Sequence, residues 1–134
     1  MPDAQSLIDR KRSAIRIRLA IERLSSVLWA DAYGAPAEDC DVHNVKSRLC
    51  LAVGRADDMN RAKALASCLR LGHAYSECSD VMHGRIRAMH LHASRHAEWI
   101  ADLERTIELV PGISSAAREE ILSIANGDPS PASL

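Results

Sequence analysis

The sequence predicts an all-α protein, folded as an antiparallel helical bundle of four main helices with a short C-terminal helix. Three observations favour this fold class. Apolar residues recur at spacings of three and four over long stretches, β-branched residues follow the same spacing, and no stretch shows the sustained alternation of apolar and polar residues that is typical of a strand. At 134 residues, of which 47% are hydrophobic, the chain has the size of one domain, which we expect to span residues 1–127.

The first helix is expected over residues 4–33. Its apolar positions recur at steps of three, four or seven residues, and they are Leu7, Ala14, Ile17, Ile21, Leu24 and Leu28. Gly34 followed by Pro36 is a typical helix stop. Residues 34–40 therefore read as a loop.

Two medium helices follow. One is expected over residues 41–53, with Asp41 as its N-cap and Gly54 just after its end. The next covers about 58–77, after a capping aspartate. We expect its buried face to consist of Ala62, Leu65, Ala66, Leu69 and His73.

The fourth helix is predicted to be long, beginning after Ser79 or Asp80 and ending before Pro111 and Gly112. Its apolar seam runs from residue 82 to residue 110 as Met82, Ile86, Met89, Ala93, His96, Ile100, Leu103, Ile107 and Val110. His96 is the single polar member, and we expect it to be half-buried and to fix the register of the helix.

A last short helix is expected over residues 115–125, beginning after Ser114 or Ser115 and closing before Gly127. The tail, residues 128–134, is rich in proline and serine and is predicted to be disordered. No internal repeat is apparent.

Composition excludes several function classes. The net charge is −1, so attraction to nucleic acid must come from a local patch rather than from the whole protein. No apolar run has the length of a membrane span and the N-terminus lacks the pattern of a signal peptide, so we expect a cytoplasmic protein that does not meet the membrane. The four cysteines form no C-x-x-C pair and are expected to be buried thiols.

Catalytic motifs are missing as well. The sequence has no G-x-S-x-G elbow and no glycine-rich phosphate loop, since its six glycines are isolated. His92 and His96 stand one turn apart, but nearby arginines would repel a metal ion. We therefore expect a protein that is not an enzyme and has no catalytic residue, no metal site and no cofactor.

Basic residues gather on the first helix. Residues 10–23 hold six cationic side chains and one acid, and Arg12, Arg16 and Arg23 fall within about 40° of one another on a helical wheel. The roots of Arg12 and Arg16 are about 6 Å apart, close to the spacing of successive phosphates on a strand. This pattern predicts contact with a nucleic-acid backbone, and a solvated helix face remains the alternative.

A second basic stretch covers residues 81–97, which contain no carboxylate. On the predicted helix His83, Arg87 and His90 line one side, while Arg95 lies on another side together with Trp99. Trp99 would either be part of the core or stack on a base. The candidate nucleic-acid-binding residues are therefore Arg12, Arg16, Arg23, His83, Arg87, His90 and Arg95.

In size, helical make-up and arginine-lined segments such as Arg12-Ser-Ala-Ile-Arg16 and Arg85-Ile-Arg87, the chain resembles the small helical subunits of CRISPR ribonucleoprotein effector complexes. This resemblance implies a non-catalytic bundle in antiviral defence that contacts an RNA or single-stranded DNA and neighbouring protein subunits. It also implies self-association or a multi-copy assembly.

Two alternatives remain. The chain could be a protein-binding module without nucleic acid, such as an antitoxin, a phage-encoded inhibitor or a dimeric scaffold, with the seam of 82–110 as an intermolecular interface. It could also be a helix-turn-helix regulator of DNA, because Cys68, Gly72, Cys78 and Val81 roughly occupy the small, turn and apolar positions of that motif.

Overall fold

The computed structural model describes residues 4–34, 44–87, 90–92 and 94–127. The elements in chain order are α1 (Ala4–Tyr33), α2 (Val45–Leu49), α3 (Leu51–Arg55), a 3₁₀ turn (Asp58–Asn60), α4 (Arg61–Met82), α5 (Arg95–Leu109) and α6 (Ser115–Asn126). No strand occurs in these residues, so the predicted all-α fold is confirmed. None of the described helices has the combined length and hydropathy that crossing a lipid bilayer requires.

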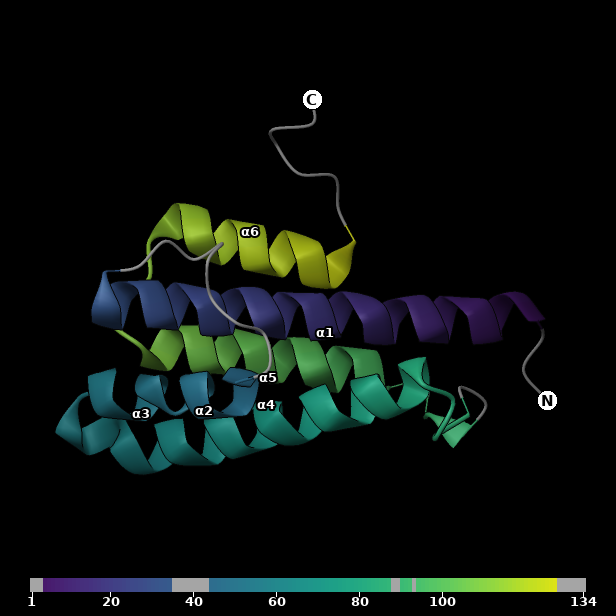
Figure 1. Cartoon of the computed structure of the whole chain (residues 1–134), viewed down its shortest axis with the longest axis horizontal. Helices are drawn as coiled ribbons and strands as arrows, with labels where there is room; N and C mark the ends of the chain where they lie inside the picture. The colour runs from purple at the N-terminus through teal and green to yellow at the C-terminus, as the bar shows by residue number, and fades with distance from the viewer. Residues whose placement is uncertain (1–3, 35–43, 88–89, 93, 128–134) are drawn as a thin grey trace.

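Helix α1 is the centre of the molecule, with α6 on one side and α4 and α5 on the other (Figure 1). Helices α4 and α6 run antiparallel to α1, and α5 runs antiparallel to α4, as predicted for the bundle. The short helices α2 and α3 pack against α4 and the C-terminal part of α1. The N-terminal half of α1 extends past the end of α6, so it is left uncovered on that side.

The predicted apolar stripe of α1 forms the core of the bundle. Ala14, Ile17, Ile21, Leu24 and Leu28 are all buried, as expected from their spacing, and Leu7 is half-buried. Gly34 has a φ of 71°, a left-handed conformation that suits glycine, and it ends the helix where the sequence predicts.

The buried face of α4 differs from the prediction. Leu65 and Leu69, placed in the core by the sequence, are 46% and 65% exposed. Small residues face inward instead, and they include Ala64, Ser67, Cys68, Gly72, Ala74 and Cys78. Their size lets α4 lie close to its neighbours, and the polar Ser67 is satisfied by a buried hydrogen bond to Thr106 of α5 at 2.5 Å.

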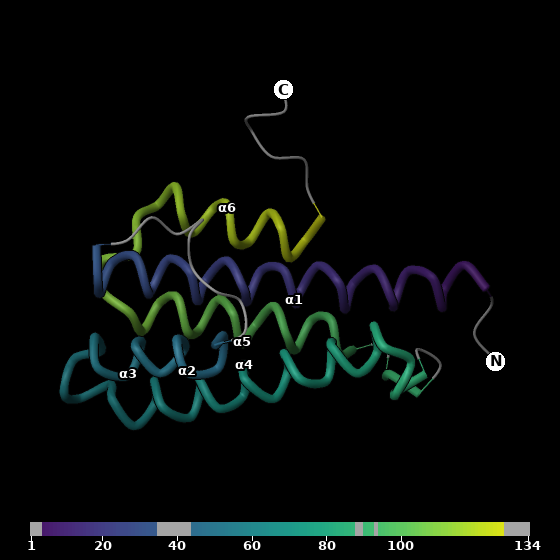
Figure 2. Tube along the Cα trace, in the orientation of Figure 1, coloured from purple at the N-terminus to yellow at the C-terminus, as the bar shows by residue number. Residues whose placement is uncertain are grey.

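The predicted long fourth helix is also wrong. Helix α4 continues through Ser79 and Asp80 to Met82, and α5 does not begin until Arg95. Past Met82 the chain leaves the helix axis at residues 83–87 (Figure 2). The cause is Gly84, with a φ of 74°: its N–H bonds to the Val81 carbonyl and the next N–H bonds to Asp80, which is the Schellman helix ending.

The C-terminal part of the predicted seam is confirmed as core. The buried seam residues of α5 are Leu103 and Ile107, and Val110, just after the helix, is buried as well. Trp99 also belongs to the core, with 1% of its surface exposed. Met89 and Ala93 lie outside the described residues.

The helix predicted over 41–53 is in fact two short helices, α2 and α3, and α3 continues through Gly54 to Arg55. Gly54 does not adopt a positive φ, so it does not act as a stop. Asp41 and Cys40 lie outside the described residues; Cys68 and Cys78 are buried thiols as expected, whereas Cys50 is exposed.

Helix α6 begins as predicted. The hydroxyl oxygen of Ser114 accepts a hydrogen bond from the Ala117 N–H, and Gly127, with a φ of 74°, closes the helix. Its buried residues Ile121 and Ala125 face α1 and complete the core. The predicted disordered tail, 128–134, lies outside the described residues.

The inward face of α4 can be tested with two matched leucines. Leu71→Ala should lower the free energy of unfolding by about 2–5 kcal/mol, because it leaves a cavity at a fully buried site. Leu69→Ala, two residues away but exposed, should change it by no more than about 0.5 kcal/mol. Urea unfolding of both variants checks this, and equal losses would contradict the observed face.

Candidate nucleic-acid interface

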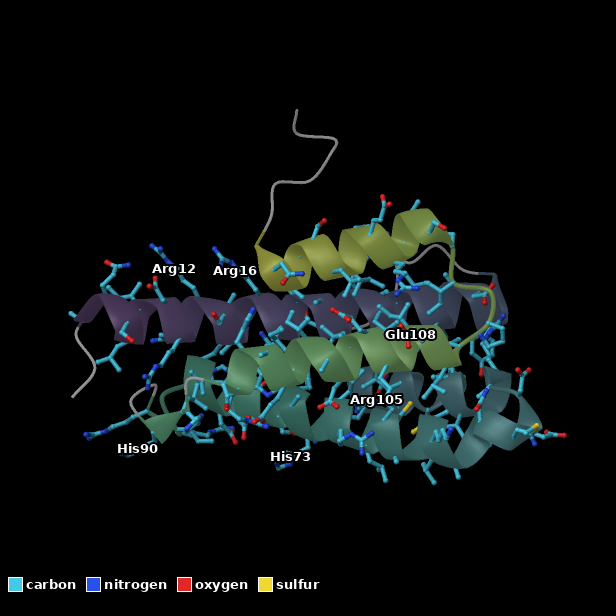
Figure 3. The ribbon with its side chains drawn as sticks, turned by 180° about the vertical axis from the view of Figure 1, so that it is seen from behind. Arg12, Arg16, His73, His90, Arg105 and Glu108 are labelled. Atoms are coloured by element: carbon cyan, nitrogen blue, oxygen red, sulfur yellow. The ribbon has the colours of Figure 1, made fainter. Side chains whose placement is uncertain are left out.

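Arg12 and Arg16 lie one turn apart on α1, and both side chains are exposed. Figure 3 shows them projecting from the same side of α1, beyond the C-terminal end of α6. Neither forms an ion pair with a carboxylate of the described residues. The guanidinium of Arg16 lies against Gly127, where an added Cβ would stand 2.5 Å from its Cζ. Two adjacent cations of the predicted site are therefore unneutralised in the described fold.

Arg23, the third predicted residue of this face, has a carboxylate partner. Its Nε lies 2.8 Å from a carboxylate oxygen of Glu120, and a second nitrogen donates to the other oxygen at 3.3 Å. This pair joins α1 to α6. Its positive charge is largely balanced, so Arg23 holds helices together rather than extending the exposed cationic face.

Arg95 is also used by the fold. Two of its nitrogens donate to Glu77 of α4, at 3.0 and 2.8 Å, and it forms a further ion pair with Glu98. The same Glu77 oxygen accepts from the indole N–H of Trp99 at 3.2 Å. The Arg95 guanidinium also lies 5.5 Å from the centre of the Trp99 ring. This network fixes the start of α5 on α4.

His83, Arg87 and His90 do not share a helical face, because the helix that would align them ends at Met82. All three are exposed in the connection between α4 and α5. The residues that separate the last two, 88 and 89, lie outside the described parts of the chain. The predicted basic side of a continuous helix is therefore wrong, although its residues remain accessible.

Arg10 and Lys11 were not among the predicted site residues, yet they define the surroundings of this connection. Arg10 donates to the Leu91 carbonyl at 2.9 Å, which ties the connection to α1. Lys11 and Arg87 border the same hollow of about 330 Å³. The hydrogen bond from Arg10 to Leu91 spans 81 residues of sequence, so periodicity alone does not reveal that this connection lies against α1.

Internal ion pairing separates two groups of basic side chains. Nine arginines pair with carboxylates in the described part of the chain, and they are Arg18, Arg23, Arg55, Arg61, Arg70, Arg85, Arg95, Arg105 and Arg118. Arg12 and Arg16 have no such partner there and lie one turn apart on the exposed side of α1, whereas Lys11 and Arg87, also without one, border a separate hollow. We call Arg12 and Arg16 the α1 basic patch.

The described residues support neither a metal site nor a helix-turn-helix. No three histidine, cysteine or carboxylate side chains converge as a metal site would need, within the described residues. His92 precedes α5, so it does not form the predicted one-turn pair with His96. The turn of a helix-turn-helix is missing at Gly72, because α4 runs straight through that residue, and this interpretation is wrong.

His96 lies beside the α1 basic patch. It is half-buried in α5, as expected, and its Nδ1 is buried without a hydrogen-bond partner in the described residues. Burial lowers the pKa of His96 below its usual 6.5, and the positive charge of Arg16 lowers it further. The imidazole is thus held in its neutral form by its surroundings.

Comparisons with known proteins give no relative: no family model, no curated protein and no solved structure matches this chain. The resemblance to small helical CRISPR subunits therefore stays a prediction.

The position of Arg16 against His96 can be tested by titration. Arg16→Gln should raise the pKa of His96 toward 6.5, because the positive charge that disfavours the imidazolium is removed. Burial of the ring stays and still lowers the pKa. Arg12→Gln is the matched control and should leave this pKa unchanged. NMR titration of the imidazole resonances measures both, and an unchanged value in Arg16→Gln would show that the two side chains are apart.

Proposed function

We propose that the protein is a non-catalytic helical subunit of a cytoplasmic nucleoprotein assembly, and that it contacts the backbone of RNA or single-stranded DNA through the α1 basic patch. The observation that carries the proposal is the pair Arg12 and Arg16, exposed, one turn apart and without a carboxylate partner in the described residues. Most other arginines of the chain are neutralised inside the fold.

The geometry suits a row of phosphates. Side chains four residues apart on a helix have roots about 6 Å apart, which is near the phosphate spacing of a strand. A guanidinium can donate two parallel hydrogen bonds to one phosphate, so each arginine can hold one phosphate firmly. Lys11 and Arg87 border a hollow on another side of α1, about 100° round the helix from Arg12, and are not needed for this contact.

The net charge of −1 supports contact along one face rather than general attraction to polyanions. A subunit of this kind would meet nucleic acid on the uncovered part of α1 and proteins elsewhere. The resemblance to small helical CRISPR subunits extends the proposal to neighbouring copies or other protein subunits of an antiviral complex.

The backbone contact is tested by removing the two arginines together. Arg12→Ala with Arg16→Ala should weaken binding to a short single strand roughly 20-fold at about 0.1 M salt, since each lost phosphate contact removes about 0.7 from the log–log salt slope. Fluorescence anisotropy over a salt series measures affinity and slope together, for RNA and for DNA of the same sequence.

The matched control is Arg105→Ala with Arg118→Ala, which changes the net charge equally but removes arginines paired to Asp102 and Glu108. The control should bind as the unchanged protein does. If the two double variants bind a single strand with equal affinity, the proposed backbone contact is wrong. It is also wrong if the unchanged protein does not bind a single strand.

One observation favours the second candidate, a protein-binding module. Leu65 and Leu69 are large apolar side chains one turn apart on the outer side of α4, and Met59, near the start of the same helix, is 92% exposed. Such a stripe gains stability when another apolar surface covers it. It would serve as a contact to a neighbouring subunit in the first proposal and as the main interface in the second.

The apolar stripe leads to a test of self-association. We expect sedimentation equilibrium to show association that increases with protein concentration and changes little with salt, because apolar burial is not screened. Leu65→Ser with Leu69→Ser should abolish it while leaving helix content unchanged. A protein that stays monomeric at every concentration would contradict this role of the stripe.

A further inference from the structure

A pocket of about 450 Å³ lies between the first turns of α1 and the start of α5. It lies in the volume range of pockets that hold small molecules or parts of larger ligands. The residues around it come from three segments, and they are Gln5, Ser6, Asp9, Arg10, Ser13, Leu91, His92, Arg95, His96 and Trp99.

Flat side chains make up much of the pocket wall. The imidazoles of His92 and His96 and the guanidinium of Arg95 over the ring of Trp99 offer planar surfaces on the α5 side. Such groups are the ones on which nucleobases stack in single-strand binding proteins. An aromatic or heteroaromatic ring therefore fits this wall better than an aliphatic ligand does.

Polar groups on α1 face the same space. Asp9, Gln5 and Ser13 carry oxygen and nitrogen atoms of the kind that pair with the edge of a base, and the Gln5 amide nitrogen already donates to Asp9 at 3.1 Å. His96 adds an Nδ1 that is buried and has no hydrogen-bond partner in the described residues. A buried polar atom of this kind is costly unless a ligand or water satisfies it.

Other small ligands fit less well. The charge of Arg95 is already balanced by Glu77 and Glu98, and the carboxylate of Asp9 stands in the pocket, so a free anion has little advantage. A metal ion lacks ligands, since no three suitable side chains converge in the described residues. An uncharged flat ring with hydrogen-bonding edges remains.

The pocket also adjoins the α1 basic patch. Arg12 is three residues from Asp9 and Arg16 is three residues from Ser13, and residues at this spacing are neighbours on a helix surface. A strand whose phosphates lie on Arg12 and Arg16 would thus pass directly beside the pocket mouth.

We propose that this pocket receives one nucleobase of the strand whose phosphates contact Arg12 and Arg16. The inference rests on the proposed function for the strand, whereas the pocket itself can be tested with a nucleoside that carries no phosphate. A stacked base strengthens binding by about 5- to 150-fold over a strand without it.

The experiment compares a short single-stranded adenine oligonucleotide with an abasic strand of the same length, which keeps the phosphates and lacks the bases. The unchanged protein should bind the adenine strand at least about 5-fold more tightly. Ser13→Leu, which fills the pocket, should lose this preference and keep its affinity for the abasic strand. Ser47→Leu, on the exposed surface of α2, is the matched control and should behave as the unchanged protein.

A second measurement separates the two proposals. Adenosine, added to the unchanged protein, should shift the NMR signals of the Trp99 indole N–H and the His96 ring until they saturate, and should leave Ser13→Leu unaffected. Saturable adenosine binding without strand binding would uphold the pocket and overturn the phosphate contact. Equal affinity for both strands together with unchanged Trp99 and His96 signals would overturn the pocket and leave the phosphate contact standing.

Discussion

Burial of the apolar stripe of α1 is the interaction on which the rest of the structure depends. Ile17, Ile21 and Leu24 are fully buried, and helices from both sides of the bundle pack against them. Because α1 has 30 residues and α6 has 12, α6 cannot cover α1 along its whole length. The uncovered N-terminal half carries Arg12 and Arg16, so the candidate interface is a direct consequence of the difference in helix length.

The helix ending at Gly84 also determines which residues lie near the candidate site. It ends α4 directly before the basic connection, and Arg10 then holds that connection against α1 through the Leu91 carbonyl. Had the helix continued, Arg87 and Leu91 would have followed Met82 on the α4 axis at a rise of about 1.5 Å per residue. The turn instead brings Arg87 beside Lys11 and places Leu91 in the wall of the pocket.

The sequence predicts helix faces and helix ends well where spacing and nearby residues determine them. It predicts them less well where burial depends on partners that are distant in the sequence. The stripe of α1 and the Ser114 cap of α6 follow from spacing and local hydrogen bonding, and both are confirmed. The inner face of α4 does not follow, because Ser67 is buried only when Thr106, 39 residues away, satisfies it. Gly84 was visible in the sequence, and its left-handed turn outweighs the apolar spacing that continues past it.

The candidate site shows the same division. The exposed pair Arg12 and Arg16 could be found on a helical wheel, whereas the partner of Arg23 lies 97 residues along the chain, in another helix. Two like charges one turn apart destabilise an isolated helix by about 0.2–0.5 kcal/mol, and no carboxylate of the described residues offsets this. In a chain that neutralises nine other arginines internally, such a pair gains most from an anion supplied by a partner, and a row of phosphates supplies two at the required spacing.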